Sequence, residues 1–180
     1  MNLKDVAIIG GGAAGASAAF HLANERKSVV ILEKDERTLF KPCGGGMAAS
    51  VQEWFPFDLT PIIEQVINRV EFTWCLSDHV VAELPGSSPF WIVRREKLDN
   101  FITENAIAKG AELIKPFKVI GIKKENEYWL VSSQDGQVAK AKSLIIADGS
   151  NSPWAQYFGL GPKKLHHAST TSVRLKGRGL

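Results

Sequence analysis

The chain has 180 residues, of which 44% are hydrophobic and 23% are charged, and its formal net charge is +3 at pH 7. This composition is typical of an ordinary globular protein and excludes a fibrous or an intrinsically disordered one. No apolar run approaches the roughly 20 residues that a membrane-spanning helix needs, and the N-terminus does not resemble a signal peptide, so we expect a cytoplasmic protein.

The first segment of the chain predicts a strand, a helix and a second strand. An apolar strand-like run over 5–10 leads into a small-residue helix over 13–25, and a strand over 28–33 ends on Glu33. The glycines between the first strand and the helix have the G-x-G-x-x-G spacing, at Gly10, Gly12 and Gly15. This order, with an acidic residue at the end of the second strand, is the fingerprint of a dinucleotide-binding βαβ unit.

Each part of this unit has an expected role. Gly10 permits the tight turn, Gly12 leaves room for a pyrophosphate, and Gly15 lets the helix pack closely on the strand. The helix N-terminus offers N–H groups and the positive end of its dipole to the phosphates. Glu33 is placed to accept hydrogen bonds from ribose hydroxyls, which favours the free 2′-hydroxyl of FAD or NAD over the 2′-phosphate of NADP.

A glycine-rich loop follows, with the sequence Lys41-Pro-Cys-Gly-Gly-Gly46. Three successive glycines cost backbone entropy on ordering, so they indicate a close approach of the backbone to another group. Lys41 can offset the charge of a ligand. Cys43 is either an ordinary small loop residue or a reactive one, and no base lies beside it in the sequence.

The rest of the chain predicts short helices over 47–69, an amphipathic helix over 95–109, and a series of strands. The expected strands cover residues 70–76, 79–84, 90–93, 112–115, 117–124, 127–133, 137–142 and 143–147. We expect the first two of these strands to be joined by a turn at Ser77-Asp78. The apolar run of the last strand indicates a buried central position in the first sheet.

Two further segments carry polar side chains at the ends of expected strands. Arg94 and Arg95 begin the amphipathic helix, where they either lie on a solvated face or meet phosphate or ribose oxygens. We favour the second role for Arg95. Asp148-Gly149 follows the buried strand, and ligands of open α/β sheets bind outside the carboxyl ends of their strands. Together with the glycine loop, this segment indicates cofactor binding rather than a simple turn.

These segments, in this order, resemble the FAD-dependent geranylgeranyl reductase family, which belongs to the flavoproteins built like p-hydroxybenzoate hydroxylase. The matching segments are Asp5–Gly15, Glu33-Lys34, Lys41–Gly46, Val93–Asp99, and Asp148-Gly149 with Ser152. The Lys-Pro-Cys-Gly-Gly stretch is the most specific of them. The resemblance covers about residues 3–160 and only the N-terminal portion of such proteins.

The resemblance implies a set of residues that hold FAD. They are Gly10, Gly12, Ala13, Ala14, Gly15, Glu33, Lys34, Lys41, Gly44, Arg95, Val119, Asp148 and Gly149. The diphosphate would lie on the glycine loop, the adenosine ribose on Glu33, and the backbone near Val119 would line the cofactor. Cys43 would lie in the loop that faces the isoalloxazine ring, as a candidate catalytic residue that contacts substrate or supplies a proton.

The expected fold is α/β, with a Rossmann-like parallel sheet that contains the βαβ FAD-binding unit and with an antiparallel three-stranded β-meander. We expect an FAD-binding domain over 1–160, in which 70–92 form an inserted strand pair on the substrate side. Residues 161–180 would then be the start of a second, incomplete substrate domain.

The expected activity is that of an FAD-dependent oxidoreductase which reduces carbon–carbon double bonds of a prenyl chain by hydride transfer from reduced flavin. NAD(P)H or a ferredoxin would reduce the flavin, and a lipid-like substrate implies contact with a membrane surface. A flavin-dependent monooxygenase shares most of these motifs and is one alternative. A truncated, non-catalytic remnant that binds FAD or another nucleotide is another.

The distribution of charge bears on the remaining classes of partner. All 19 acidic residues lie at or before Asp148, and five basic residues follow it. These basic residues are sparse, and no aromatic residue follows Phe158, so we expect no nucleic-acid partner. The histidines and the two cysteines lack metal-ligand spacing, and we expect no metal site.

Overall fold

The structure of the protein is a computed structural model that describes residues 2–36, 41–87 and 89–160, together with residues 168, 171 and 173. Its elements are β1 (Lys4–Ile9), α1 (Ala13–Asn24), β2 (Val29–Leu32), β3 (Gly46–Ala48), η1 (Ala49–Trp54), η2 (Thr60–Ile62), β4 (Ile63–Ile67), β5 (Arg69–Trp74), β6 (Ser77–Glu83), β7 (Phe90–Val93), α2 (Arg95–Ala108), β8 (Glu112–Ile114), β9 (Val119–Glu125), β10 (Tyr128–Ser133), β11 (Val138–Ile146) and α3 (Pro153–Tyr157). These elements form two compact units, the first within residues 1–39 and 99–167 and the second within 40–98 and 168–180.

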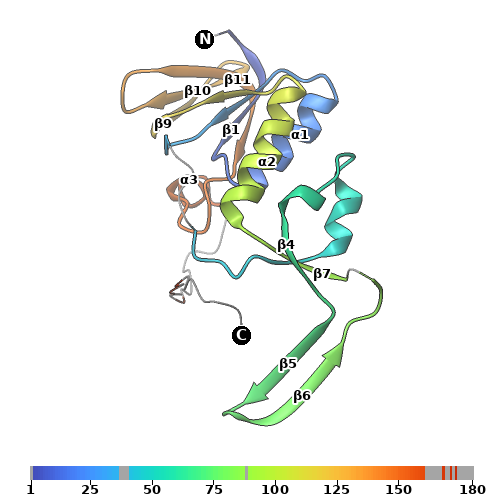
Figure 1. The fold of residues 1–180 in the computed structure, drawn as a ribbon. Coiled ribbons are helices and arrows are strands. Elements are labelled where there is room, and N and C mark those ends of the chain that lie inside the picture. Colours follow the sequence, from blue (N-terminus) through green and yellow to red (C-terminus); the bar gives the residue numbers. More distant parts are fainter. Residues whose placement is uncertain are drawn as a thin grey trace. The chain divides into compact units, whose positions relative to one another are not determined.

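The first unit is built on a six-stranded sheet with the order β8-β2-β1-β11-β10-β9 (Figure 1). Strands β8, β2, β1 and β11 are parallel to one another, whereas β9, β10 and β11 form an antiparallel meander. Ile9 of β1 lies between Leu32 of β2 and Ile146 of β11. The expected fold class, a Rossmann-like parallel sheet with a βαβ unit and a three-stranded meander, is confirmed.

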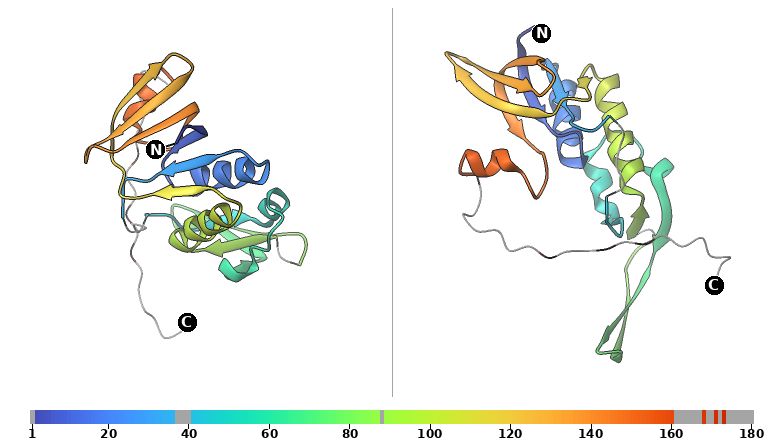
Figure 2. Two further views of the ribbon diagram at one scale, coloured as in Figure 1. Left: turned by 90° about the horizontal axis from the view of Figure 1, so that it is seen from above. Right: turned by 90° about the vertical axis from the view of Figure 1, so that its left-hand side faces the viewer.

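Strands β1 and β2 are apolar and buried on both faces, and Val6–Ile9 of β1 are all buried. All four residues of β2 are buried, as parallel strands covered on both sides usually are. The small side chains of α1, with Ala16 and Ala19 fully buried, let that helix lie close to β1 and β2. Figure 2 shows α1 and α2 side by side. A cluster of buried side chains forms a core around β1, β2 and the meander: Ala7, Ile9, Val30, Leu32, Phe117, Val131, Ala139 and Ala141.

The second unit contains the three-stranded sheet β3-β7-β4 and the hairpin β5–β6. The expectation of short helices over 47–69 is wrong in part: η1 and η2 are single short 3₁₀ segments, and β3 and β4 are strands. Both strands exist because each pairs with β7, on opposite sides of it. Residues 70–92, expected to hold an inserted strand pair, lie in this unit, and the expected start of a substrate domain at 161–180 lies outside the described residues except for 168, 171 and 173.

Two further expectations about the elements require correction. The turn of the hairpin lies at Cys75-Leu76 and not at Ser77-Asp78, because Trp74 pairs with Ser77. The separate strands expected over 137–142 and 143–147 are one strand, β11, which pairs with β10 through its first half and with β1 over most of its length. The short helix α3 was not expected. Of the helices in the described ranges, none is long and apolar enough to cross a membrane.

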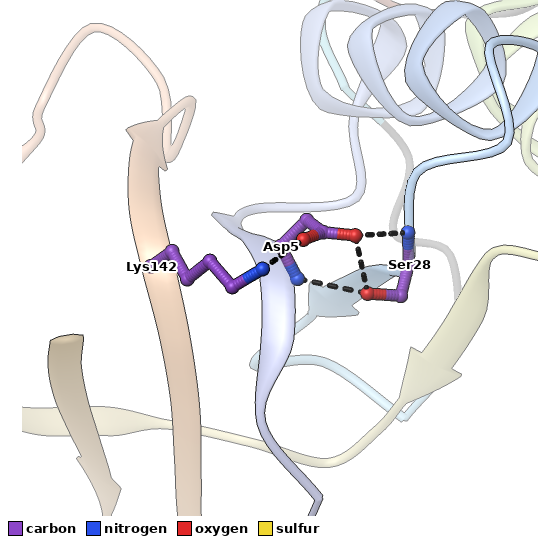
Figure 3. Close-up of polar contacts among 3 residues, drawn as sticks. All are labelled: Asp5, Ser28 and Lys142. Carbon is purple, nitrogen blue, oxygen red and sulfur yellow. Dashed lines mark hydrogen bonds and ion pairs between the residues drawn. The ribbon is translucent and has the colours of Figure 1, made fainter.

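Asp5, near the start of β1, is hydrogen-bonded to the residues of two other segments of the first sheet (Figure 3). They are Ser28, just before β2, and Lys142, in β11. Its carboxylate accepts hydrogen bonds from the backbone N–H of Ser28 at 3.0 Å, from the Ser28 hydroxyl at 2.8 Å, and from Lys142 Nζ at 2.8 Å. The Asp5 N–H in turn donates to Ser28 Oγ. The bond from Lys142, followed by those from Ser28, holds the pKa of Asp5 well below its ordinary value of 3.8.

We expect the contribution of Asp5 to stability to depend on pH. Because its pKa is lower in the folded than in the unfolded chain, its stabilising effect is fully present above about pH 4 and is lost as the pH falls below that value. Asp5→Asn should therefore lower the Tm at pH 7, with a smaller difference from the unsubstituted chain at pH 3. Thermal unfolding of both chains at the two pH values measures this, and an equal difference at both would contradict it.

Candidate functional site

The glycine loop between β1 and α1 is held closely by the chain itself. Gly10 has φ +101°, and a Cβ built there would lie 2.5 Å from the carbonyl oxygen of Ala147. At Gly15 a Cβ would lie 1.9 Å from the carbonyl oxygen of Gly10. Only glycine fits these two positions, so the tight turn and the close helix packing expected of them both exist in the structure.

The N-terminus of α1 has the properties of an anion-binding site. Gly12 is its N-cap residue and provides no side-chain cap, and the first turn contains no acidic residue. The first N–H groups of a helix have no partner within the helix. Ala13 and Ala14, the first two helical residues, carry only methyl side chains. The 12-residue helix therefore presents backbone donors and the positive end of its dipole beside the glycine loop.

Glu33 lies at the end of β2 and contacts the glycine loop directly. Its Oε2 accepts a hydrogen bond of 2.6 Å from the N–H of Gly11, and its Oε1 accepts one of 3.0 Å from the N–H of Asp35. The backbone of Glu33 is held on both sides, because its N–H donates to Ile114 and its carbonyl accepts from Phe117. The contact with Gly11 was not expected from the sequence. The feature of the sequence that could have indicated it is the run of three consecutive glycines at 10–12.

Asp148 lies beside the same loop although it is far away in the sequence. The N–H of Ala147 donates to the carbonyl of Ile9 at 2.8 Å, which extends the pairing of β11 with β1. A Cβ on Gly10 would consequently lie 2.9 Å from Cα of Asp148. Asp148 Oδ1 is buried and has no hydrogen-bond partner among the residues that the structure describes. Gly149, with φ +98°, faces open space.

These observations test whether the residues of the first unit fit a dinucleotide. A buried carboxylate oxygen without a partner is costly in a folded protein. Here it belongs to Asp148, whose Cα lies next to a tight glycine turn that leads into a helix N-terminus without a side-chain cap. An adenine dinucleotide has ribose hydroxyls that can donate to carboxylates and phosphates that can accept from helix N–H groups. The residues present therefore fit such a group.

The other expected site residues of the first unit lie on its surface or beside its core. Lys34 is exposed immediately after Glu33. Val119 begins β9 and packs against the core around Phe117, whose N–H donates to the carbonyl of Glu33 at 2.7 Å. Because Val119 lies two residues after Phe117, this hydrogen bond links the chain near Val119 to the end of β2. Ser152, part of the family resemblance, caps α3 by accepting from Ala155 N–H at 2.9 Å.

The loop 41–46 belongs to the second unit, where it is attached to β7. Gly45 has φ +74°, and a Cβ there would lie 1.9 Å from the carbonyl oxygen of Val93. The N–H of Val93 donates to the carbonyl of Gly45 at 2.9 Å. The expected close approach of these glycines is therefore an approach to β7, whereas Gly44 faces open space. Cys43 is exposed, and its Sγ accepts from the N–H of Gly45 at 3.4 Å.

Arg95 lies two residues after the end of β7, the strand to which the glycine-rich loop is attached. Its neighbour Arg94 pairs with Glu64 of β4 at 3.4 Å, and Lys97 pairs with the same carboxylate at 2.5 Å. Lys41 lies at the start of the described part of the loop and is exposed. The roles of Lys41, Cys43, Gly44 and Arg95 toward a cofactor stay predictions.

Comparisons with known proteins agree with this description. Protein FixC of Escherichia coli strain K12 is 28% identical over 172 residues, which cover 90% of this chain and 40% of FixC. Digeranylgeranylglycerophospholipid reductase of Methanocaldococcus jannaschii is 28% identical over 169 residues, which cover 91% of this chain and 42% of the reductase. The chain thus spans about two fifths of the length of these relatives.

Solved structures share the fold. A geranylgeranyl bacteriochlorophyll reductase-like protein from Thermoplasma acidophilum has a TM-score of 0.77 at 22% identity, over 92% of this chain and 44% of that protein. The halogenase PltM, solved in complex with phloroglucinol and FAD, has a TM-score of 0.67 at 22% identity, over 88% of this chain and 37% of the halogenase. The chain therefore shares its fold with a protein that binds FAD.

The model of one protein family, pyridine nucleotide-disulphide oxidoreductase, matches residues 4–177. The match includes β1, the glycine loop, Glu33 and Asp148, which are the residues that the structure brings together at one edge of the sheet. Because it extends over nearly the whole chain, this protein belongs to the pyridine nucleotide-disulphide oxidoreductase family.

Proposed function

We propose that this chain is the dinucleotide-binding part of an FAD-dependent oxidoreductase. The observation that carries the proposal is Asp148, whose Cα lies beside Gly10 just after β11 and whose buried Oδ1 accepts no hydrogen bond from the described residues. Such an oxygen is satisfied when a ligand hydroxyl donates to it. The glycine loop follows β1 and Glu33 follows β2. Phosphate-binding and ribose-binding groups therefore lie at the same end of the sheet as Asp148.

In this proposal the residues of the chain divide the binding of FAD between them. The N–H groups at the start of α1 bind the diphosphate, and Gly10 and Gly15 keep the loop compact enough for it to approach. Glu33 accepts from the adenosine ribose, for which its carboxylate has to share or exchange the hydrogen bond from Gly11. Asp148 accepts a hydrogen bond from a hydroxyl on the flavin side of the diphosphate.

We further propose a prenyl chain of a lipid-like molecule as the substrate. Support comes from the name of the M. jannaschii relative, a digeranylgeranylglycerophospholipid reductase, at 28% identity. The chemistry that FAD supplies when bound is hydride transfer, here to one carbon of a carbon–carbon double bond. The second carbon needs a proton, and Cys43 is the proposed donor. NAD(P)H or a ferredoxin supplies the electrons, and a lipid-like substrate implies contact with a membrane surface.

We expect the purified chain to be yellow, with a flavin absorbance band that remains after gel filtration. If FAD binds only the folded chain, FAD at 100 times its Kd adds about 2.7 kcal/mol to the free energy of unfolding. For a chain of this size the Tm then rises by about 5–10 °C. Riboflavin is the matched control ligand, because it lacks the diphosphate and the adenosine and should shift the Tm little. A colourless chain whose Tm does not respond to FAD would overturn the proposal.

The proposed reaction is tested separately, under anaerobic conditions. The flavin is reduced chemically, a prenyl lipid is added, and both flavin reoxidation and loss of the lipid double bond are measured. Stoichiometric reoxidation with a saturated product supports the reductase. Reoxidation that occurs only after oxygen is admitted, with an oxygen atom inserted into the product, would instead support a monooxygenase. Bound flavin with neither reaction would leave the chain as a binding module.

A further inference from the structure

The hairpin β5–β6 has two chemically different faces. Because side chains alternate along a strand, Val70, Phe72 and Trp74 lie on one face of β5. The pairs Val70–Ala82 and Phe72–Val80 extend this apolar face onto β6. It is exposed: Phe72 and Val80 are each 59% accessible and Trp74 is 73% accessible. In Figure 1 the hairpin extends beyond β4 and β7, the strands that lead into and out of it.

The opposite face carries charged side chains beside Val81, which pairs with Glu71, and these charges interact with one another. Arg69 pairs with Glu71 at 2.6 Å and with Glu83 at 3.7 Å. His79 Nε2 lies 2.9 Å from the same Glu71 carboxylate. A two-stranded hairpin alone is marginally stable in water. This hairpin therefore has a charged face stabilised within itself and an apolar face that requires a partner.

The turn of the hairpin presents a leucine to solvent. Cys75 and Leu76 have φ values of +50° and +61°, a left-handed conformation that two-residue hairpin turns usually assign to asparagine or glycine. Leu76 is 97% accessible. Apolar exposure thus increases along the hairpin from Phe72 through Trp74 to Leu76. A bulky apolar residue in a strained and fully exposed turn indicates that the tip makes a contact.

We propose that the tip and the apolar face of β5–β6 dock on the surface of a lipid bilayer. A tryptophan that is apolar over most of its ring and carries one N–H donor suits the boundary between headgroups and hydrocarbon. Leu76 would enter first and Trp74 and Phe72 would follow. The hairpin carries three acidic residues, Glu71, Asp78 and Glu83, against Arg69, so its charge favours zwitterionic over anionic lipid. The inference deepens the proposed contact with a membrane surface.

A second copy of the chain is a poorer occupant for this face. Two strands of six or seven residues form a ribbon about 20 Å long and 10 Å wide, which is roughly 200 Å². Stable protein interfaces bury about 800 Å² on each partner. The increase in exposure toward the turn also favours a contact made by the tip over one spread evenly along the strands.

The experiment measures flotation of the full chain with phosphatidylcholine vesicles. We expect the double variant Trp74→Ser/Leu76→Ser to bind at least tenfold more weakly than the unsubstituted chain. The matched control is Trp54→Ser/Leu160→Ser, whose side chains are 72% and 66% accessible but lie outside the hairpin, and it should bind like the unsubstituted chain. Phosphatidylglycerol added to the vesicles should not strengthen the part of the binding that the hairpin variant removes.

Vesicles that contain brominated phosphatidylcholine provide a second measurement. Bromine should quench the fluorescence of the unsubstituted chain and of Trp54→Phe, and it should quench Trp74→Phe much less. Equal vesicle binding by the hairpin and control variants would overturn the proposal. So would absence of vesicle binding together with a dimer, seen by light scattering, that Trp74→Ser/Leu76→Ser dissociates. FAD binding is measured on the same samples, so that failure of the lipid contact is distinguished from failure of the proposed cofactor site.

Discussion

Gly15→Ala is expected to destabilise the protein by about 3 kcal/mol or more, at or above the upper end of the usual cost of overpacking. The added methyl group would lie 1.9 Å from the carbonyl oxygen of Gly10 and 3.3 Å from the side chain of Ile8. A backbone carbonyl cannot move aside without opening the turn that joins β1 to α1. Urea unfolding measures the change, and FAD affinity should fall with it because the same turn positions the helix N-terminus.

Two other glycines separate this steric effect from the effects of backbone conformation. Gly136 has φ +86° with open space around it, so Gly136→Ala should cost only about 1–2 kcal/mol, the strain of a left-handed alanine. Gly44 also faces open space and has no positive φ. Gly44→Ala should therefore change stability by less than about 1 kcal/mol. Equal costs at Gly15 and Gly136 would show that the helix adapts and that the close approach is not needed.

Glu33→Ala is expected to weaken FAD binding by about 1–3 kcal/mol, or roughly 5- to 150-fold in Kd, because ribose hydroxyls lose their acceptor. The structure adds a second expectation. Glu33 also accepts from the N–H of Gly11 at 2.6 Å. The variant should therefore lower the stability of the chain without FAD as well, by about 1 kcal/mol.

Titration calorimetry and thermal unfolding measure these two effects independently. Glu33→Gln is the informative second variant, because its amide oxygen can still accept from Gly11 while the negative charge is lost. We expect it to retain most of the stability and to lose part of the affinity. An unchanged Kd in Glu33→Ala would show that this carboxylate does not hold the ribose, whatever happens to the Tm.

The elements that the sequence predicted well are those whose signal is local. The strand over 5–10, the helix over 13–25 and the strand over 28–33 differ from β1, α1 and β2 by at most one residue at each end. Apolar runs of strand length and small residues at helical spacing reflect the backbone preferences of the segment itself. The roles assigned to Gly10 and Gly15 also agree with the geometry, because the turn leaves no room for a side chain at either position.

The elements predicted poorly depend on partners distant in the sequence. Residues 63–67 contain no strong strand pattern, yet they form β4 because they pair with β7. The hairpin turn was expected at Ser77-Asp78, whose side chains favour turns. The pairing of Phe72 with Val80 and of Trp74 with Ser77 instead places the turn at Cys75-Leu76 and requires a bulge. Cross-strand packing outweighs the local turn preference in this segment.

The sequence by itself determined the βαβ unit, the glycine loop and the acidic residue at the end of β2, and through them the prediction of a dinucleotide ligand. Only the tertiary structure decided that Asp148 lies against Gly10, that Glu33 contacts Gly11, and that Phe72, Trp74 and Leu76 are exposed on one hairpin. The physical reason is the range of the interactions. Glycine spacing and periodicity record what a few neighbouring residues require, whereas the insertion of β11 beside β1 and the exposure of a face depend on how distant strands pair.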